Sequence, residues 1–595
     1  MSAQLLQQAA KAFNQGQYQQ CVSLCAKMLK QQPRNVTAMM LLGLAEFRQG
    51  RTEEGIAHLR KILTLDPGHL ETLNNLAIIL EQTAQYDEAK NCYQRAITAH
   101  PKALMSYANF GDLLRKTGQT EKAIEVLEQG LHVDEQHFPC LNYLALCYEQ
   151  QGKRTQAIAI LSRITKIDPN NERANANLGS LYYLDKQYEQ ALSPLNDALR
   201  INPTSLSALN SLAATLIDMS RLEEAWPFLE RAMAIAPEAP EVLDNLGKWY
   251  LFSGELDQAL IYLNQASEKM PDNLKPVWHR SFVYLLKGDY ARGWDDYFAG
   301  YTSGERMIRA FPFPVWQGES LHEKTILIHA EQGIGDEIMF ASCLPDVIAV
   351  AGHVIIECDS RLGELYQRAF PGAEIISGPR SENFAQLSRL TSIDYHLPCG
   401  CLPRLLRRDI SNFPGTPFLR ADEEKILRWR KRYQDIGENL NVGISWRAGK
   451  LNNQEKRSIH LVDMLPLLSL PGISFINLQY GDCQQEIADL RNQYGITVHH
   501  WPDSDPKNEQ DDFAAQISAL DAVLSVSNAT VHLAGALGVK TFNLLPYVPS
   551  WRWTMYGDKT PWYDCVELLR QSSNEDWTEV LSKATDRLRA LGTHG

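Results

Sequence analysis

Two glycines and an acid form a turn that could do chemistry: Gly333, Gly335 and Asp336. The apolar run 326–328 before the turn predicts a short buried strand, and the residues after it predict a helix. Such a turn can hold an anion, because the free N–H groups of a helix start point outward. The third glycine of a dinucleotide-binding fingerprint is missing, since Ile338 stands there, which argues against a nicotinamide site. Asp336 at the mouth of this turn needs another explanation.

Two later turns also carry polar side chains that suit a phosphate. The first follows the apolar run 441–445 and contains Trp446, Arg447 and Lys450, with Arg457 shortly after. The second lies between an apolar run and a helix start and contains Ser527, Asn528, Thr530 and His532. His532 has a plain structural alternative, because a single histidine at a helix start often only packs. Trp551, Arg552, Trp553 and Trp562 are either walls of the same site or packing residues.

A metal site is not expected. Asp503-Ser504-Asp505 resembles a D-x-D metal motif, but it lies in a polar stretch that we interpret as a surface loop. The 11 cysteines are scattered, and no two pairs have the spacing of a zinc site. We interpret them as reduced, mostly buried thiols.

Short apolar runs that alternate with helical patterns must position these turns. The first series of strand candidates is 325–329, 353–357, 374–376 and 395–397. After a helical stretch at 423–434, a second series follows at 441–445, 474–478, 497–499, 522–526 and 541–544. Alternating strands and helices predict parallel sheets, so two doubly wound lobes with a cleft between them are expected. The last helix, 577–591, is amphipathic and could cross back to the first lobe.

The first half of the chain repeats with a period of 34 residues. Prolines recur at Pro33, Pro67, Pro101, Pro169, Pro203, Pro237 and Pro271, with Glu135 once in their place. A small residue follows each after ten positions, another after 22, and a large one after 26. This pattern resembles the tetratricopeptide repeat, in which small residues let two helices cross closely and proline ends the second helix. We expect eight repeats over residues 2–273 and a degenerate ninth to about residue 300.

Asparagines recur on the expected inner face of this solenoid: Asn75, Asn109, Asn142, Asn177, Asn210 and Asn245. An asparagine amide both donates and accepts, so a ladder of them could hold the backbone of an acceptor protein. The repeats of the O-linked N-acetylglucosamine transferase, which this array resembles, use such a ladder. The alternative is that these asparagines are ordinary solvated residues.

Composition excludes several other classes. A net charge of −13 argues against nucleic-acid binding, which requires a basic surface. The N-terminus lacks the basic and apolar regions of a signal peptide, and no apolar stretch reaches the ~18 residues of a membrane span. We therefore expect a cytoplasmic protein without a membrane partner. Its predicted parts are a solenoid over 1–303, a linker over 304–323 that packs on the next domain, an N-terminal lobe over 324–422 and a C-terminal lobe over 423–595.

Several stretches resemble the heptosyltransferase-like glycosyltransferase domains that bacteria fuse to tetratricopeptide repeats. They are AEQGIGDEIMFASCLP (330–345), VGISWRAGK (442–450), KRSIHL (456–461), the segment 511–546, PSWRW (549–553), PWY (561–563) and LLRQ (568–571). The resemblance implies a GT-B fold of two Rossmann-like lobes. The family pattern has Asp-Thr where this chain has Ser527-Asn528, which removes a carboxylate from the expected donor site.

The resemblance also implies roles for the residues. Asp336 occupies the place of the general base, which takes the proton of the acceptor hydroxyl; Glu331 is the rival base, and helix capping is the plain alternative for Asp336. The basic residues would stabilise the leaving phosphate of a nucleotide sugar without a metal or other cofactor. The layout is similar to that of bacterial flagellin glycosyltransferases that use nonulosonic acids such as pseudaminic acid, and a CMP-activated donor is compatible with the altered turn. The alternative function is a scaffold that binds partners through its repeats and carries an inactive cleft.

Overall fold

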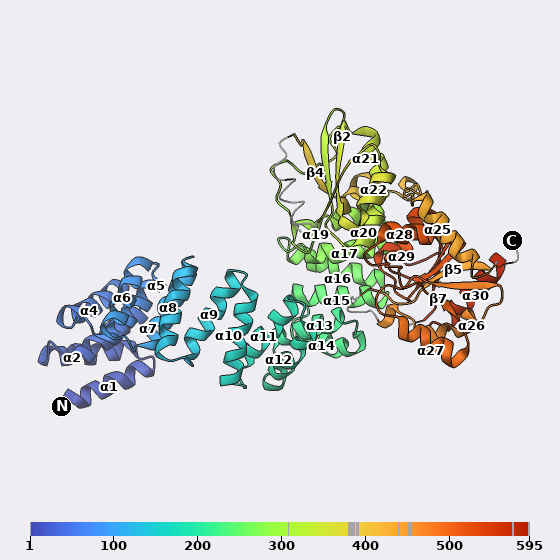
Figure 1. The fold of residues 1–595 in the computed structure, drawn as a ribbon. Coiled ribbons are helices and arrows are strands. Elements are labelled where there is room, and N and C mark those ends of the chain that lie inside the picture. Colours follow the sequence, from blue (N-terminus) through green and yellow to red (C-terminus); the bar gives the residue numbers. More distant parts are fainter. Residues whose placement is uncertain are drawn as a thin grey trace. The chain divides into compact units, whose positions relative to one another are not determined.

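The structure is a computed structural model, and it describes residues 2–306, 309–378, 387, 392–437, 439–449, 455–573 and 576–592. The chain divides into two compact units, residues 1–215 and 216–595 (Figure 1). No helix within the described ranges is long and apolar enough to cross a membrane. Lys450, one of the predicted phosphate-binding residues, lies outside the described residues.

The first unit consists of antiparallel helix pairs. Its helices are α1 (Ser2–Asn14), α2 (Tyr18–Gln31), α3 (Val36–Arg48), α4 (Thr52–Leu65), α5 (Leu70–Gln82), α6 (Tyr86–Ala99), α7 (Leu104–Lys116), α8 (Thr120–Val133), α9 (Phe138–Gln150), α10 (Arg154–Ile167), α11 (Glu172–Leu184) and α12 (Tyr188–Ile201). The next helix, α13 (Leu206–Asp218), runs across the boundary between the units. Pro33, Pro67 and their equivalents each follow the end of the second helix of a pair by two residues, as the repeat pattern predicts.

The small and large positions of the repeat meet inside each pair. A Cβ atom added to Gly111 would lie 2.4 Å from Cγ of Leu127, and one added to Gly179 would lie 2.4 Å from Cγ of Leu195. The two leucines are completely or almost completely buried. The pattern therefore reflects one local contact, in which the first helix approaches the second closely enough for the leucine to fill the space beside glycine.

Replacing Gly179 with alanine should destabilise the solenoid by about 1–2 kcal/mol. Overpacking a closed contact costs roughly 1–3 kcal/mol, and the better helix propensity of alanine returns about 1 kcal/mol or less. Urea denaturation of the full chain, followed by circular dichroism, measures the effect. Gly68→Ala, in the turn between α4 and α5, controls for an added methyl group without overpacking, since its new Cβ would meet Ala99 at an ordinary 3.4 Å. Equal midpoints for the two variants would show that this contact does not limit packing.

The second unit begins with the remaining repeat helices. They are α14 (Leu222–Ile235), α15 (Pro240–Ser253), α16 (Leu256–Lys269), α17 (Lys275–Leu286), α18 (Tyr290–Tyr297) and the single turn α19 (Ala299–Thr302). Buried Trp294 and Tyr297 of α18 belong to the same hydrophobic core as the α/β part that follows. The predicted linker also packs against that part, because Trp316 is buried and its backbone N–H donates to the carbonyl of His396 at 2.9 Å.

The first α/β part, which we call the N-lobe (residues 324–422), has a four-stranded parallel sheet. Its strands β1 (Thr325–His329), β2 (His353–Asp359), β3 (Glu374–Gly378) and β4 (Tyr395–Pro398) lie in the order β3-β2-β1-β4. In register, Thr325 pairs with His353 and Ile326 with Tyr395. The helices are α20 (Ile334–Ala341), α21 (Leu344–Val350), α22 (Gly363–Ala369) and α24 (Leu402–Leu406), and the 3-10 turns are η1 (Ser360–Leu362), η2 (Cys399–Cys401) and η3 (Ile410–Asn412).

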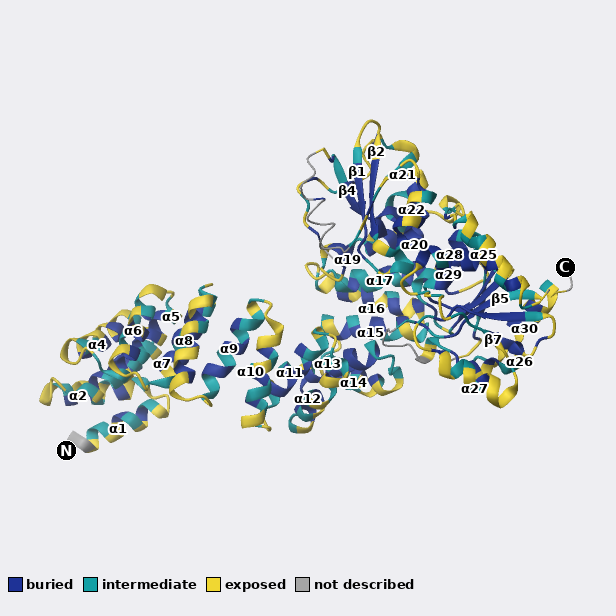
Figure 2. Cartoon of the chain, in the orientation of Figure 1, coloured by how far each residue is buried: buried dark blue, intermediate teal, exposed yellow. Residues whose placement is uncertain are grey.

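The second α/β part, the C-lobe (residues 423–595), has a six-stranded parallel sheet of order β10-β9-β8-β5-β6-β7. The strands are β5 (Leu440–Ser445), β6 (Ile473–Asn477), β7 (Val498–His499), β8 (Ala522–Val526), β9 (Thr541–Leu545) and β10 (Val566–Arg570). The helices are α25 (Glu423–Gln434), α26 (Leu465–Leu468), α27 (Gln484–Tyr494), α28 (Gln510–Ser518), α29 (Ala529–Leu537) and α30 (Thr578–Gly592), with turns η4 (Glu455–Arg457), η5 (Leu461–Met464) and η6 (Trp551–Trp553). Strands β8 (Ala-Val-Leu-Ser-Val) and β9 (Thr-Phe-Asn-Leu-Leu) are buried at every position, which explains why they are mainly apolar and carry no charge. Figure 2 shows the buried sheet of this lobe at the label of β5.

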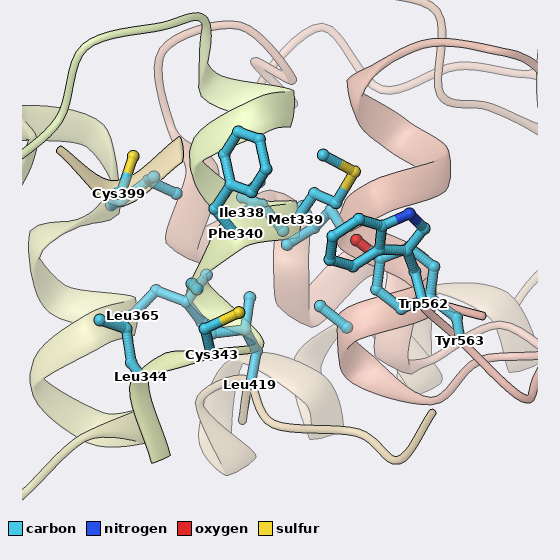
Figure 3. Close-up of a cluster of buried hydrophobic side chains, with 14 of the residues drawn as sticks. Ile338, Met339, Phe340, Cys343, Leu344, Leu365, Cys399, Leu419, Trp562 and Tyr563 are labelled. Carbon is cyan, nitrogen blue, oxygen red and sulfur yellow. The ribbon is translucent and has the colours of Figure 1, made fainter. Parts of the chain in front are cut away.

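Helix α20 joins the lobes. Ile338, Met339 and Phe340 are completely buried, so three successive side chains of this short helix pack into the core. Figure 3 shows these side chains between N-lobe residues such as Leu365 and the C-lobe residues Trp562 and Tyr563. The first turn of α20 meets α29, since a Cβ on Gly335 would lie 3.3 Å from Cα of Ala529.

The structure corrects the strand and helix predictions in two places. All nine strand candidates are present, with ends shifted by two residues or fewer, but strand β10 was not predicted. It is an edge strand whose sequence, Val-Glu-Leu-Leu-Arg, carries two charges among three buried apolar residues. The last helix, α30, does not cross back to the N-lobe. It packs on α26 and β10, because Leu581, Ala584 and Leu588 join the C-lobe core.

Candidate functional site

Each sheet has one point where the chain reverses its direction of winding. In the N-lobe this point lies between β1 and β4, and in the C-lobe between β5 and β8. Ligands of open parallel sheets bind beside the carboxyl ends of the strands at such points. The turn with Gly333 follows β1, and the turns at Trp446 and Ser527 follow β5 and β8, so the predicted site residues gather at the two reversal points.

Asp336 and Arg552 connect these two regions. Arg552 donates from Nε to Oδ1 of Asp336 at 2.5 Å, across 216 positions of sequence. Asp336 stands at the third position of α20, yet within the described residues its carboxylate accepts from this guanidinium and not from the backbone of its own helix. Burial opposes the charge, but the Asp336 carboxylate raises the pKa of Arg552 above its ordinary value. Capping is therefore not the role of Asp336.

A second guanidinium lies in the same place. Arg457 donates from Nη2 to the carbonyl of Ser527 at 2.9 Å. Burial and, secondly, the nearby Arg552 guanidinium lower the pKa of Arg457, while Tyr480 and Asp336 act in the opposite direction. Two guanidinium groups beside one carboxylate leave one positive charge in excess, and an anion bound here would relieve their repulsion.

The loop that carries Arg552 is firmly held. Trp553 donates from Nε1 to Oγ of Ser527, and Arg570 donates to the carbonyls of Trp553, Thr554 and Gly557. Burial lowers the pKa of Arg570 to about 10. The loop also reaches the repeats, because Met555 N–H donates to the carbonyl of Leu286 at 2.7 Å. Arg552 is thus placed by the C-lobe and by helix α17 together.

The residues predicted after β5 are mostly engaged within the C-lobe. Trp446 is 1% exposed and donates to Glu486 at 2.7 Å, so it is a core residue and not a wall of the donor site. Arg447 donates to the carbonyl of Asp482 at 2.6 Å and pairs with Glu486 at 3.0 Å. The backbone N–H groups of Trp446 and Arg447 both donate to Oε1 of Gln479. This turn therefore offers a phosphate fewer donors than the sequence suggested.

The residues predicted after β8 hold the two strand ends together. Asn528 caps α29 by accepting from the N–H of Thr530 at 3.0 Å, and its amide donates to Oγ of Ser445 at 2.8 Å. Ser527 contributes its carbonyl and hydroxyl to Arg457 and Trp553, and Thr530 is 1% exposed. His532 stacks on Trp553 at 4.7 Å, and burial lowers its pKa to about 3, so the ring is neutral. These four side chains are buried, so they position Arg457 and Arg552 and offer little surface to a ligand.

The other predicted residues of the glycine turn have separate roles. Gly335 permits the close approach of α20 to α29, whereas a Cβ on Gly333 would enter open space. Glu331, the rival base, is 5% exposed and forms a buried ion pair with Arg306. Both carboxylates pair with an arginine, but the Glu331 side chain is completely buried, whereas the Asp336 side chain is 16% exposed, so an acceptor hydroxyl can reach Asp336 more easily.

Five of the six asparagines of the predicted ladder are half-buried, and the sixth is buried. Asn75, Asn109, Asn142, Asn177 and Asn210 are half-buried, on α5, α7, α9, α11 and α13. Asn75 already donates to the sulfur of Met40 at 3.7 Å. Asn245 on α15 is 5% exposed and cannot offer its amide to a bound chain, so it does not belong to the ladder.

The Asp503-Ser504-Asp505 stretch forms a loop, as expected. Asp503 pairs with Arg432 at 2.5 Å, and Asp505 accepts from the backbone of Lys507 at 3.0 Å. Among the described residues, no group of three or more His, Cys, Asp or Glu side chains is placed to hold a metal ion.

Arg552 is the residue that sequence reasoning undervalued. The sequence marked it only as a wall or packing residue, together with Trp551, Trp553 and Trp562. Trp553 and Trp562 are indeed buried, whereas Trp551 is half-exposed and lies under the Arg552 guanidinium at 4.4 Å. The signal available in the sequence was an arginine between tryptophans, since aromatic faces hold a guanidinium in place.

Comparison with known proteins identifies the repeats. A model for the N-terminal repeat region of Psidin matches residues 7–110, and tetratricopeptide-repeat models match residues 114–181, 150–216 and 204–272. Residues 7–272 thus contain tetratricopeptide repeats, and an α/β region with parallel sheets follows them. Repeats of this kind bind other proteins.

A curated relative is Protein FlbA of Caulobacter vibrioides, which is 31% identical over 333 residues. The match covers 52% of this chain and 54% of FlbA, so the chain spans about half the length of this relative.

Solved structures with similarity include YrrB, described as a repeat protein with an unusual peptide-binding site, at 20% identity and a TM-score of 0.28. It matches 31% of this chain and 95% of its own. A tetratricopeptide-repeat protein of Parabacteroides merdae matches at 14% identity and a TM-score of 0.31, over 42% of this chain and 98% of its own. At TM-scores this low, no inference about this chain follows from either structure.

Proposed function

We propose that this chain is a protein glycosyltransferase of the GT-B kind, which transfers a sugar from a nucleotide-sugar donor to a Ser or Thr hydroxyl of a protein held by the repeats. The observation that carries the proposal is the Asp336–Arg552 pair with Arg457 beside it, where the reversal points of two parallel sheets meet. A carboxylate and two guanidinium groups are the parts that this reaction requires: a base for the hydroxyl and cations for the departing phosphate.

The individual groups fit these roles. Asp336 lies in the first turn of α20, and its carboxylate accepts a hydrogen bond from Arg552. Arg552 uses Nε and Nη1 within the protein, which, as far as the described residues show, leaves Nη2 for a ligand. Arg457 donates one hydrogen bond to Ser527 and is half-buried. A monophosphate such as that of a CMP-activated sugar requires no more cationic groups than these.

The acceptor and sugar follow from the resemblance of the sequence to flagellin glycosyltransferases. On that basis flagellin is the proposed acceptor, and a nonulosonic acid such as pseudaminic acid is the proposed sugar, in the cytoplasm. The repeats support a protein acceptor in general, since they bind proteins. They do not select flagellin among proteins.

The test is transfer by the purified full chain. The chain is incubated with flagellin and with CMP-, UDP- and ADP-activated sugars in turn, and the intact mass of flagellin is measured. An added sugar mass with one donor class supports the proposal. If no donor is hydrolysed or transferred, although flagellin binds, the chain is a scaffold with an inactive cleft.

Transfer should be insensitive to EDTA. Arg457 and Arg552 supply the positive charge for the leaving phosphate, and the carboxylates of Asp503 and Asp505 are engaged in a surface loop. We expect the rate with excess EDTA to stay within about twofold of the untreated rate. Loss of activity that manganese or magnesium restores would contradict the assignment of the two arginines.

A further inference from the structure

A cavity of about 270 Å³ lies beside the Asp336–Arg552 pair, at the reversal point of the N-lobe sheet. Its walls are aromatic: Trp278 and Phe282 of α17, Tyr297 of α18 and Trp551 of η6. Phe282 stacks on Trp551 at 6.3 Å, and Tyr297 lies 5.2 Å from Trp551. The last repeat helices and the C-lobe loop therefore build one pocket between them.

The polar side chains at this cavity already have partners within the protein, including Arg552, which pairs with Asp336 and keeps Nη2 for the donor phosphate. Arg306 pairs with Glu331, and Glu305 pairs with Lys275 at 3.2 Å. Gln332 donates to the hydroxyl of Tyr297 at 2.9 Å. A sugar ring would need hydroxyl partners and would have to break these pairs, whereas an apolar group requires none.

The volume of the cavity also limits which group can bind in it. Its volume is below the roughly 300–1,000 Å³ of pockets that enclose a whole small-molecule ligand, so it does not enclose a whole nucleotide sugar. One large side chain does. Aromatic rings bury about 150–250 Å² each and gain further energy from edge-to-face contacts with aromatic walls.

We propose that this cavity holds a large apolar side chain, preferably aromatic, of the acceptor polypeptide near the hydroxyl that is modified. That this side chain belongs to an acceptor rests on the proposed function, because a hydroxyl has to reach Asp336 only if the chain transfers a sugar. The repeats then contribute directly to the reaction centre, since two of the four aromatic walls, Trp278 and Phe282, belong to a single repeat helix.

The test uses the full chain labelled with 5-fluorotryptophan and observed by fluorine NMR. Trp278→Phe and Trp551→Phe variants assign the two cavity signals among the 12 tryptophans. The probe is N-acetyl-L-phenylalaninamide, with N-acetyl-L-alaninamide and methyl β-glucopyranoside as comparisons. We expect saturable shifts of the Trp278 and Trp551 signals with the phenylalanine amide alone, with Kd on the order of 1 mM. The signals of Trp226 and Trp249, whose rings contact each other at 4.6 Å within the repeats, should not move.

Phe282→Ala should weaken this binding by roughly tenfold, because it removes one aromatic wall. Phe228→Ala, the same change on repeat helix α14 away from the cavity, should leave the binding unchanged. If the Phe282→Ala melting temperature falls, Phe282→Leu serves instead and should weaken binding by a smaller factor. Shifts caused by the glucoside, or no shift with any probe, would overturn the proposal. Shifts with the phenylalanine amide in a chain that transfers no sugar would refute the proposed function only, and the cavity would then hold a side chain of a binding partner.

Discussion

Asp336→Asn should lower the rate of sugar transfer by roughly 10²–10⁴-fold and leave donor affinity equal or tighter. The asparagine oxygen can still accept from Nε of Arg552, so the geometry of the pair is retained while the base is lost. Loss of one negative charge beside two guanidinium groups favours the donor phosphate, which is why affinity should not fall. Transfer kinetics, donor titration by calorimetry and a thermal melt measure the three quantities.

Asp346→Asn is the matched control for this substitution. Asp346 is also an acid in the first turn of a helix, α21, and it pairs with Arg407 at 2.6 Å. Its replacement should affect stability but not the chemical step. Near-normal transfer by a folded Asp336→Asn protein would place the base elsewhere. Glu331→Gln would then be tested, although breaking its buried pair with Arg306 is expected to cost about 3–5 kcal/mol of stability.

Arg552→Met should reduce kcat/KM by roughly 10²–10³-fold, comparable to the loss of one donor to a developing anion. Unlike Asp336→Asn, it should also weaken donor binding, since a phosphate contact acts before and during transfer. Arg552→Lys should recover part of this loss, because it keeps the charge but not the planar fork that bonds Asp336 and Ser550 together. Donor titration and initial rates on the same preparations measure the effect.

Arg432→Met controls for the structural part of the Arg552 substitution. Arg432 lies over Trp429 at 4.5 Å and pairs with Asp503 at 2.5 Å, as Arg552 lies over Trp551 at 4.4 Å and pairs with Asp336 at 2.5 Å. The two changes remove the same kind of contacts, but only one of them is at the candidate site. Equal effects on transfer would show that Arg552 acts through stability alone.

The sequence by itself determined the repeats and the strands. Each repeat is specified by contacts between residues 16 positions apart, such as Gly179 and Leu195, and by a proline that ends each second helix. Central parallel strands such as β8 (Ala-Val-Leu-Ser-Val) are buried on both faces and therefore appear as mainly apolar, uncharged runs. Edge strand β10 was not predicted because the charged Glu567 and Arg570 interrupt its apolar residues.

Only the tertiary structure decided which of the polar residues meet. Sequence order placed Asp336 at a turn, but its partner Arg552 comes from the other lobe, 216 positions later. The tertiary structure also places Trp446 in the core. Asn528 joins the ends of β5 and β8, because its amide donates to Ser445. The physical reason is that side-chain chemistry and local periodicity are properties of short segments. Which strand ends lie together, and which aromatic residues of the last repeat face them, depends on the order of strands in a sheet and on the packing of α20 against α29.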